Sequence, residues 1–291
     1  MVCRCVRRSI LSSSTDRRRR AGSTGRGSVA REEDSRESRD PAPAVTRSIR
    51  LLGLLAAAEP RTLTELAGEL GLAKSSTANL CLALEAGGMI QRTSAGYRLG
   101  LRTAELGGAF AAQFNQVREF YSVCEASEVL SGELVQVALL DGAESLYLAR
   151  HEGSRSLRLG TPLGSRLPAA LSATGRALLM SMSDDEVVAL LGHDAVFPQL
   201  TERGARNMTE LLEVLAAARR RGWALDAEES FRGVVGVAVP LEPWAPSDPA
   251  LALGVAIRAP EADFERIERV GEALRAAARQ LTNPFSAAAR R

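Results

Sequence analysis

LTELAGELGLAKSSTANLCLALEA, residues 63–86, is the stretch that decides the fold of the first part of this chain. Its apolar residues recur at helical spacing on either side of Gly71, which predicts two short helices joined by a tight turn. Glycine readily adopts the left-handed backbone conformation that ends many helices. Thr62 and Glu65 have the spacing of a capping box, which predicts that the first helix begins at Leu63. The segment therefore indicates a helix-turn-helix.

The sequence on both sides of this segment completes a winged helix domain. An apolar stripe predicts a helix that begins near Val45 and ends before Pro60. Its buried face is expected to comprise Ile49, Leu52, Leu55 and Ala56, flanked by Leu51 and Leu54. Residues 89–92 and 97–99 read as two short strands around a turn that contains glycine. Three helices followed by a hairpin predict a winged helix-turn-helix over residues 45–104.

The second helix of the quoted segment begins with one cation and several small polar side chains. A recognition helix places its N-terminal residues against base edges and phosphates in the major groove. The alternative is that Ser75 and Ser76 only cap a structural helix, but this does not account for the whole unit with its wing. We therefore expect double-stranded DNA as a partner. The candidate contacts are Ser76, Thr77 and Asn79 to bases, Lys74, Arg92 and Arg98 to phosphate or the minor groove, and Arg47 and Ser75 beside them.

Charge is distributed unevenly along the 291 residues, although the net charge is only +2. Residues 1–44 carry 11 Arg and 6 acidic residues, residues 45–110 carry a net charge of +2, and residues 111–291 a net charge of −5. The basic residues are 36 Arg and one Lys, a bias that is weak evidence for nucleic-acid binding by itself. Because it has few apolar residues, the segment 1–44 is predicted to be a disordered tail. Its run Arg17–Arg20 could add phosphate contacts.

The rest of the chain predicts an α+β domain after a helical linker. Residues 105–119 are expected to form the linker helix, residues 120–281 the domain, and residues 282–291 a C-terminal tail. Helical periodicity covers residues 101–114, 117–130, 172–182, 183–191, 208–221 and 262–281, and strand patterns cover residues 134–140, 145–150, 157–159, 223–226, 235–240 and 251–257. Residues 160–168 read as a loop.

Composition and motifs exclude several function classes. No apolar run is long enough to predict a membrane-spanning helix. The four Cys (Cys3, Cys5, Cys81 and Cys124) form no C-x-x-C pair, and there are only two His, so we expect no metal site and no cofactor. Sparse cysteine is typical of a reducing compartment, and we expect a cytoplasmic protein. The G-x-S-x-G elbow, the Walker A motif and a strand-linked G-x-G-x-x-G are all missing, so we do not expect an enzyme.

From Val45 to about Leu281 the chain resembles the IclR family of bacterial transcriptional regulators. The matching front segments are Val45–Ile49, Leu63–Ala67, Gly71–Thr77 and Tyr97–Gly100, and the matching back segments are Gly164–Pro168, Ser172–Leu179, Arg220–Glu229 and Gly233–Pro240. Two sets of motifs in the right order are far more specific than a helix-turn-helix alone. The resemblance implies a winged helix domain, a C-terminal GAF-like effector-binding domain, and a homodimer or dimer of dimers on a DNA operator.

The same resemblance implies a pocket for a small organic effector, a carboxylate or an aromatic acid. The implied lining is Leu159, Leu167, Ala173, Thr174, Asp226, Val234, Gly236, Ala256 and Arg258. Backbone amides at the start of the helix at Ala173–Gly175 would suit a carboxylate. Arg258 departs from the family, where this position is often small and polar. Its side chain could pair with Asp226, clamp a carboxylate, or face away from the pocket.

Two other functions compete with an effector-controlled regulator. One is a dimeric DNA-binding protein that needs no effector, although the second domain is larger than dimerisation alone requires. The other is an enzyme that uses Asp226 with Glu228 and Glu229, although such acids are more often solvated or ion-paired. Apolar residues near helical spacing, Leu101, Leu106, Phe110 and Phe114, favour a dimer because they exceed what the small front core can bury.

Overall fold

The computed structural model describes residues 40–56, 59–155, 157, 161–245 and 248–283. These residues form two compact units, one ending at Phe110 and the other starting at Ala111. Most of the expected N-terminal tail, including Cys3 and Cys5, lies outside the described residues, as do Leu159 and the end of the expected C-terminal tail. None of the described helices is both long and apolar enough to span a membrane.

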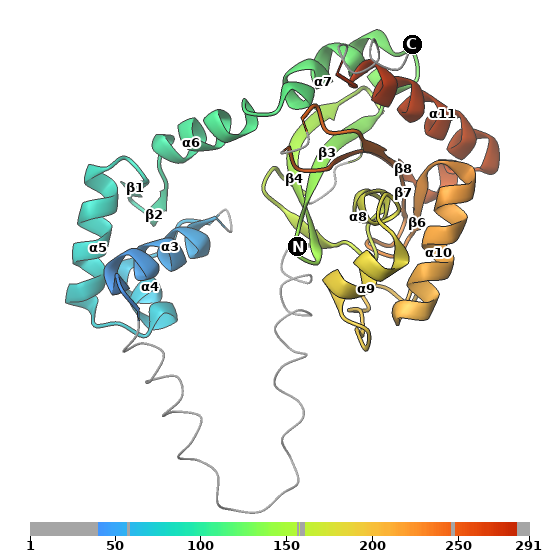
Figure 1. Ribbon diagram of the computed structural model, residues 1–291. Helices are drawn as coiled ribbons and strands as arrows, with labels where there is room; N and C mark the ends of the chain where they lie inside the picture. The colour runs from blue at the N-terminus through green and yellow to red at the C-terminus, as the bar shows by residue number, and fades with distance from the viewer. Residues whose placement is uncertain (1–39, 57–58, 156, 158–160, 246–247, 284–291) are drawn as a thin grey trace, which may run out of the picture. The chain divides into compact units, whose positions relative to one another are not determined.

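The first unit is a winged helix-turn-helix, as the sequence predicts (Figure 1). Its elements are α3 (Pro43–Leu55), α4 (Leu63–Leu70), α5 (Lys74–Ala86), β1 (Ile90–Thr93), β2 (Gly96–Leu99) and α6 (Leu101–Ala111). The capping box of Thr62 and Glu65 is present, and Gly71 ends α4 with a φ of 67°. These local signals were correct because each depends on residues only three or four positions apart.

The core of this unit is formed by Leu51, Leu55, Leu66, Leu70, Cys81, Ile90 and Tyr97. The prediction that Ile49 is buried is wrong, because its side chain is 64% exposed. The face of α3 that packs against α4 and α5 is centred on Leu51 and Leu55, which lie one turn apart. The buried face of α3 is therefore rotated about the helix axis relative to the apolar stripe that the sequence predicted.

The wing is fixed to the chain that precedes α4. Arg61 and Tyr97 exchange two backbone hydrogen bonds, of 2.9 and 2.8 Å, so the segment before α4 extends the hairpin. Gly96 lies beside this contact with a φ of 129°, and a Cβ there would lie 2.4 Å from the carbonyl oxygen of Arg61. Glycine at this position therefore permits the close approach of the wing to the helical part of the unit.

The second unit alternates strands and helices in one α+β domain. It comprises α7 (Asn115–Ala126), η1 (Leu130–Gly132), β3 (Leu134–Asp141), β4 (Glu144–Glu152), β5 (Arg166–Pro168), α8 (Ala173–Leu179), α9 (Asp184–Leu191), α10 (Met208–Arg221), β6 (Ala224–Ala227), β7 (Val234–Leu241), β8 (Leu251–Arg258), η2 (Ala259–Glu261) and α11 (Phe264–Gln280). A second capping box, of Ser183 and Glu186, begins α9.

Three predicted elements differ from the structure. Residues 105–119 are not one continuous helix, because the chain leaves the helical conformation at residues 112–114 and Phe114 packs against the core of the second unit. Residues 166–168 form β5 rather than a loop, since they pair with the edge of β4. Leu157 lies outside any strand, and residues 158–160 lie outside the described residues.

All strand pairs of the six-stranded sheet are antiparallel, in the order β5-β4-β3-β8-β7-β6. Alternate residues of each strand point to opposite faces. Val135, Val237 and Val255 point to the face covered by α7 and α11, where the largest apolar core lies. Ala138, Ala238 and Ala252 point to the opposite face, where their small side chains leave room for helices. Helices α8 and α10 lie on that side of the sheet (Figure 1).

Candidate DNA-binding surface and effector cavity

The exposed face of α5 carries the side chains expected to contact DNA. Lys74, Ser75, Ser76 and Asn79 are all exposed, while Cys81 on the other side of the helix is fully buried. Helix α5 packs against α4 and α3, so its polar face is held on a rigid unit. Small side chains on an exposed helix face allow close approach to the floor of a major groove.

Thr77 corrects the predicted contact set. Its side chain is fully buried, and its hydroxyl donates a hydrogen bond of 3.2 Å to the carbonyl oxygen of Ala73. A hydroxyl in that position cannot reach a base edge, so the prediction that Thr77 reads bases is wrong. The side chain instead points toward the core of the unit, on the side of α5 opposite to its exposed polar face.

The predicted basic contacts of the wing are exposed. The guanidinium of Arg92 lies 5.9 Å from the centre of the Tyr97 ring, a cation–π distance. Arg98 donates two hydrogen bonds, of 2.8 and 3.2 Å, to the side-chain oxygen of Gln91 on the paired strand. Arg47 is half-buried on α3. The wing therefore presents two positioned cations, and their role in DNA contact stays a prediction.

A small cavity lies in the second unit between α8, the sheet and the loop that joins β6 to β7. Its volume is about 40 Å³. The lining includes most of the effector residues predicted from the sequence: Leu167, Ala173, Thr174, Asp226, Val234, Gly236 and Ala256. Gln136, Tyr147, Ser172, Ser230, Phe231, Gly254 and Val255 complete the wall. The structure thus brings most of the expected effector residues around one small cavity.

Arg258 does not line this cavity. Its side chain is 55% exposed, and its Nε atom lies 3.8 Å from a carboxylate oxygen of Glu261 in η2. Of the three alternatives that the sequence left open, the structure therefore shows the one in which Arg258 faces away. The residue ends β8, where the chain turns into η2, so the alternation of strand faces no longer directs its side chain inward.

A cluster of hydroxyl groups forms the polar side of the cavity. The Tyr147 hydroxyl lies 3.1 Å from Thr174 Oγ1, and Ser145 Oγ lies 3.0 Å from Ser172 Oγ. Ser172 also accepts a hydrogen bond of 3.2 Å from the amide of Gly175. One of the amides expected to receive a carboxylate is therefore already occupied. Burial raises the pKa of Tyr147 to about 12, so its hydroxyl keeps its proton at neutral pH.

Asp226 is the acidic group of the cavity. One of its carboxylate oxygens accepts hydrogen bonds from the amides of Glu229, at 2.7 Å, and Ser230, at 3.2 Å. Burial raises the pKa of Asp226 to about 6, although the Ser230 side chain, the amide of Glu229 and the charge of Arg176 act in the opposite direction. The buried Ser230 hydroxyl lies close enough to Asp226 to lower its pKa, although the geometry of a full hydrogen bond is not reached within the described chain. The second carboxylate oxygen and this hydroxyl can therefore meet a ligand.

A buried ion pair supports the Asp226 loop from behind. Arg176 on α8 is 1% exposed and donates hydrogen bonds to both carboxylate oxygens of Glu229. The same guanidinium donates hydrogen bonds of 2.8 Å to the carbonyl oxygens of Ala170 and Leu225. Because every charged atom is paired, this buried group is compatible with a stable fold. The pair fixes the loop that follows β6 against the helix that begins beside the cavity.

The described lining of the cavity contains hydroxyl, amide and carboxyl groups but no Lys or Arg. Such a site favours a ligand with its own hydrogen-bond donor and an uncharged body. Sequence reasoning missed Gln136, Tyr147 and Ser230 because each reads as an ordinary strand or loop residue. Strand alternation alone could have placed Gln136 on the same face as Ala138. Among the described residues, no cluster of His, Cys, Asp and Glu could hold a metal ion.

Comparison with known proteins covers both units. Residues 44–94 match the IclR helix-turn-helix domain. Residues 117–283, more than half of the chain, match the family described as bacterial transcriptional regulator IclR C-terminal. The two matches lie in the same order as the two sets of motifs in the sequence.

Individual relatives agree with these matches. The HTH-type transcriptional regulator XynR of Escherichia coli is 28% identical over 68% of this chain and 79% of its own length. The HTH-type transcriptional regulator BhcR of Paracoccus denitrificans is 27% identical over 91% of this chain and 94% of its own length. The crystal structure of an IclR homologue from Microbacterium hydrocarbonoxydans, complexed with 4-hydroxybenzoate, has a TM-score of 0.68 at 22% identity and covers 82% of this chain and 97% of that one.

Proposed function

This chain belongs to the IclR family of bacterial transcriptional regulators, and from this premise we propose that a small organic effector in the Asp226 cavity controls its affinity for a specific DNA operator. The observation that carries the proposal is the pairing of two features in one chain. One is an exposed polar face on α5, and the other is a small cavity whose lining includes the buried Asp226 and Ser230.

On the DNA side, Ser76 and Asn79 are proposed to contact bases, with Ser75 beside them. Lys74, Arg92 and Arg98 are proposed to contact phosphates or the minor groove, with Arg47 nearby. All but the half-buried Arg47 are exposed. Each phosphate contact releases counterions, so binding should weaken with salt. Because one unit can cover only one half-site, operator binding is proposed to need a homodimer or a dimer of dimers.

On the effector side, the cavity chemistry favours a hydroxyl-bearing aromatic or other small organic molecule. A ligand hydroxyl can donate to Asp226, and Leu167, Phe231 and Val234 offer apolar surface for a ring. Because the described lining contains no cation, a carboxylate group on the ligand adds little to its affinity unless it shares a proton with Asp226. The solved relative from Microbacterium hydrocarbonoxydans is complexed with 4-hydroxybenzoate, a ring that has such a hydroxyl and also a carboxylate.

The present size of the cavity has a consequence for the response. A volume of about 40 Å³ accommodates a few water molecules, since one water needs on the order of 10–15 Å³ on the same scale. A ring-sized effector must therefore displace part of the wall. The segment of Ser230 and Phe231 is the proposed moving part, because it lines the cavity and belongs to no helix or strand, whereas Glu229 before it is held by Arg176. An effector that binds only the open form shifts the population toward it.

The test is operator affinity measured with and without 4-hydroxybenzoate and a panel of hydroxylated aromatic compounds. The Asp226→Ala variant should keep operator affinity without effector and lose the response to the compound that acts on the parent. Asp194→Ala, which removes an exposed acid in a loop, is the matched control and should respond normally. A tenfold response corresponds to a coupling free energy of about 1.4 kcal/mol.

Two outcomes would contradict the proposal. If Asp226→Ala responds like the parent, Asp226 does not bind the effector. If no compound changes operator affinity or the thermal midpoint, the second candidate, a DNA-binding protein that needs no effector, is favoured. The small volume of the cavity is the observation that keeps this second candidate in view.

A further inference from the structure

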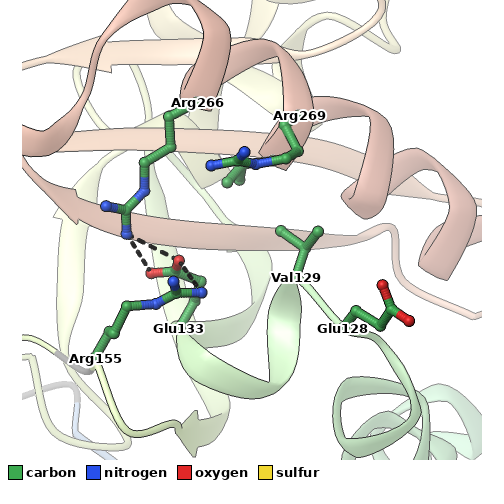
Figure 2. Close-up of a pocket in the computed structure, with 7 residues that line it drawn as sticks. Glu128, Val129, Glu133, Arg155, Arg266 and Arg269 are labelled. Atoms are coloured by element: carbon green, nitrogen blue, oxygen red, sulfur yellow. Dashed lines mark hydrogen bonds and ion pairs between the residues drawn. The ribbon is translucent and has the colours of Figure 1, made fainter.

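A larger cavity lies near α11, apart from the Asp226 cavity. Its volume is about 260 Å³, and it is lined by Glu128, Val129, Glu133, Arg155, Arg266, Arg269 and Val270 (Figure 2). These residues come from the segment before β3, the loop after β4 and helix α11. Val270 belongs to the core between the sheet and α11, whereas Ala173 of the Asp226 cavity belongs to the core on the α8 face. The two cavities therefore use different faces of the sheet.

Glu133 is the anchor of this cavity. Its side chain is 3% exposed, and its two carboxylate oxygens lie 2.9 and 3.2 Å from one guanidinium nitrogen of Arg266. A nitrogen of Arg155 lies 3.3 Å from the same carboxylate. Arg266 also donates a hydrogen bond of 2.8 Å to Glu261. Burial alone would lower the pKa of Arg266, but Glu133 and Glu261 reverse this and raise it, so the cation is firmly held.

Three arginines and two glutamates, Glu128 and Glu133, line the cavity, so the lining itself has an excess of one positive charge. Arg266 is balanced by Glu133 and Glu261, while Arg155 has only a share of Glu133. Arg269 has no acidic partner among the described residues, and Figure 2 shows its guanidinium extending toward Arg266. The carboxylate of Glu128 points away from all three guanidiniums in the same view. The donors left over are those of Arg155 and Arg269.

We propose that this cavity is a second ligand site, which binds a small oxyanion, a carboxylate or phosphate group, between Arg155 and Arg269. Guanidinium groups bind both kinds of group through pairs of parallel hydrogen bonds. Glu133 sets the geometry, because it holds Arg155 and Arg266 in fixed positions. A bound anion would join the loop after β4 to α11. The proposal is independent of the Asp226 cavity.

The test is calorimetric titration of the full chain with inorganic phosphate and, separately, with malonate. Arg269→Gln removes an exposed side chain without an acidic partner, so the fold should be retained, and it should weaken binding about tenfold. Arg155→Gln should weaken binding similarly. Arg275→Gln removes an exposed charge on the same helix that does not line the cavity, and should leave the affinity unchanged.

Each outcome has a defined meaning. Saturable binding of phosphate alone or of malonate alone supports the site and identifies which oxyanion it prefers. Absence of saturable binding of both ions at millimolar concentration would overturn the proposal. An equal loss of affinity in Arg275→Gln and Arg269→Gln would also overturn it, because it would indicate general attraction to a basic surface.

Discussion

Asp226 combines burial with a raised pKa, and this gives it a measurable effect on stability. Its folded pKa of about 6 exceeds its ordinary value of 3.8. Between these values the folded protein binds the proton that the unfolded chain releases. The group therefore favours folding at pH values below about 4, and this contribution is lost as the pH rises through about 6.

We expect Asp226→Asn to be more stable than the parent at pH 8 by roughly 2–3 kcal/mol, since two pKa units correspond to about that free energy. The asparagine oxygen can still accept the two amide hydrogen bonds of the loop. Denaturant unfolding of both proteins at pH 5 and pH 8 measures the difference. If the variant's advantage in free energy of unfolding is smaller at pH 8 than at pH 5, the raised pKa of Asp226 is contradicted.

Thr77 provides a second prediction at the residue scale. Because its side chain is buried and its hydroxyl is used within α5, Thr77→Val should leave operator affinity within about twofold of the parent and change stability by less than about 1 kcal/mol. Operator titration by fluorescence anisotropy measures the affinity. A loss of specificity at one base pair of the operator would show that Thr77 reaches DNA after all.

At the scale of elements, α5 and the wing are proposed to act together as a DNA-binding surface. Asn79→Ala should weaken operator binding by about 1–3 kcal/mol and relax specificity at one position. Lys74→Gln should weaken binding to all sequences and lower the salt dependence by about one unit. Affinities measured over a series of salt concentrations separate the two effects. Equal salt slopes for parent and Lys74→Gln would exclude a phosphate contact by Lys74.

Helix α8 is close to the sheet because of glycine in the strands. A Cβ at Gly254 on β8 would lie 2.7 Å from Thr174 Cγ2 and 3.2 Å from Ala238 Cβ. Real Cβ atoms do not approach this closely, so either α8 or the Thr174 side chain would have to move. The same approach places Thr174 and Tyr147 within hydrogen-bond distance beside the cavity.

We therefore expect Gly254→Ala to destabilise the protein by about 1–3 kcal/mol through overpacking. Adding Thr174→Ser removes the crowding methyl group but keeps the hydroxyl, and should restore most of the loss. Gly107→Ala is the control, because a Cβ there meets nothing within 4 Å. Thermal unfolding of the four proteins measures the effect, and a double variant no more stable than Gly254→Ala would refute this packing account.

At the scale of the whole molecule, the charge distribution and exposed apolar residues favour an oligomer. Residues 45–110 have a net charge of +2, which gives one copy little non-specific affinity for DNA. Leu101 and Leu106 on α6 are 84% and 49% exposed. Residues 111–291, with a net charge of −5, are expected to repel DNA, which suits a role in effector binding and assembly.

We expect sedimentation equilibrium at micromolar concentration to give a mass of at least twice 31.0 kDa. Leu106→Glu should weaken this association, because it places a charge in the proposed apolar contact. It should weaken operator binding in parallel. A single 31.0 kDa species for the parent protein would contradict the dimer.

The sequence by itself determined the local structure and the family. The two capping boxes, at Thr62 and Ser183, and the left-handed Gly71 are present as predicted. Each of these signals acts between residues that are neighbours along the chain, so no knowledge of distant contacts is needed. The helix-turn-helix, the wing and the alternation of strands and helices follow from the same short-range rules.

Only the tertiary structure decided which side chains face inward and which distant groups meet. Helical spacing places Thr77 one turn before the buried Cys81 and on the side opposite to Asn79, but its polar side chain favoured a base contact, and the structure shows that it is buried. Arg258 faces Glu261 because the strand ends there. Glu133 and Arg266 are 133 positions apart, and their ion pair arises because the sheet and α11 pack together. Contacts of this kind depend on the packing of separate elements, which spacing along the chain does not specify.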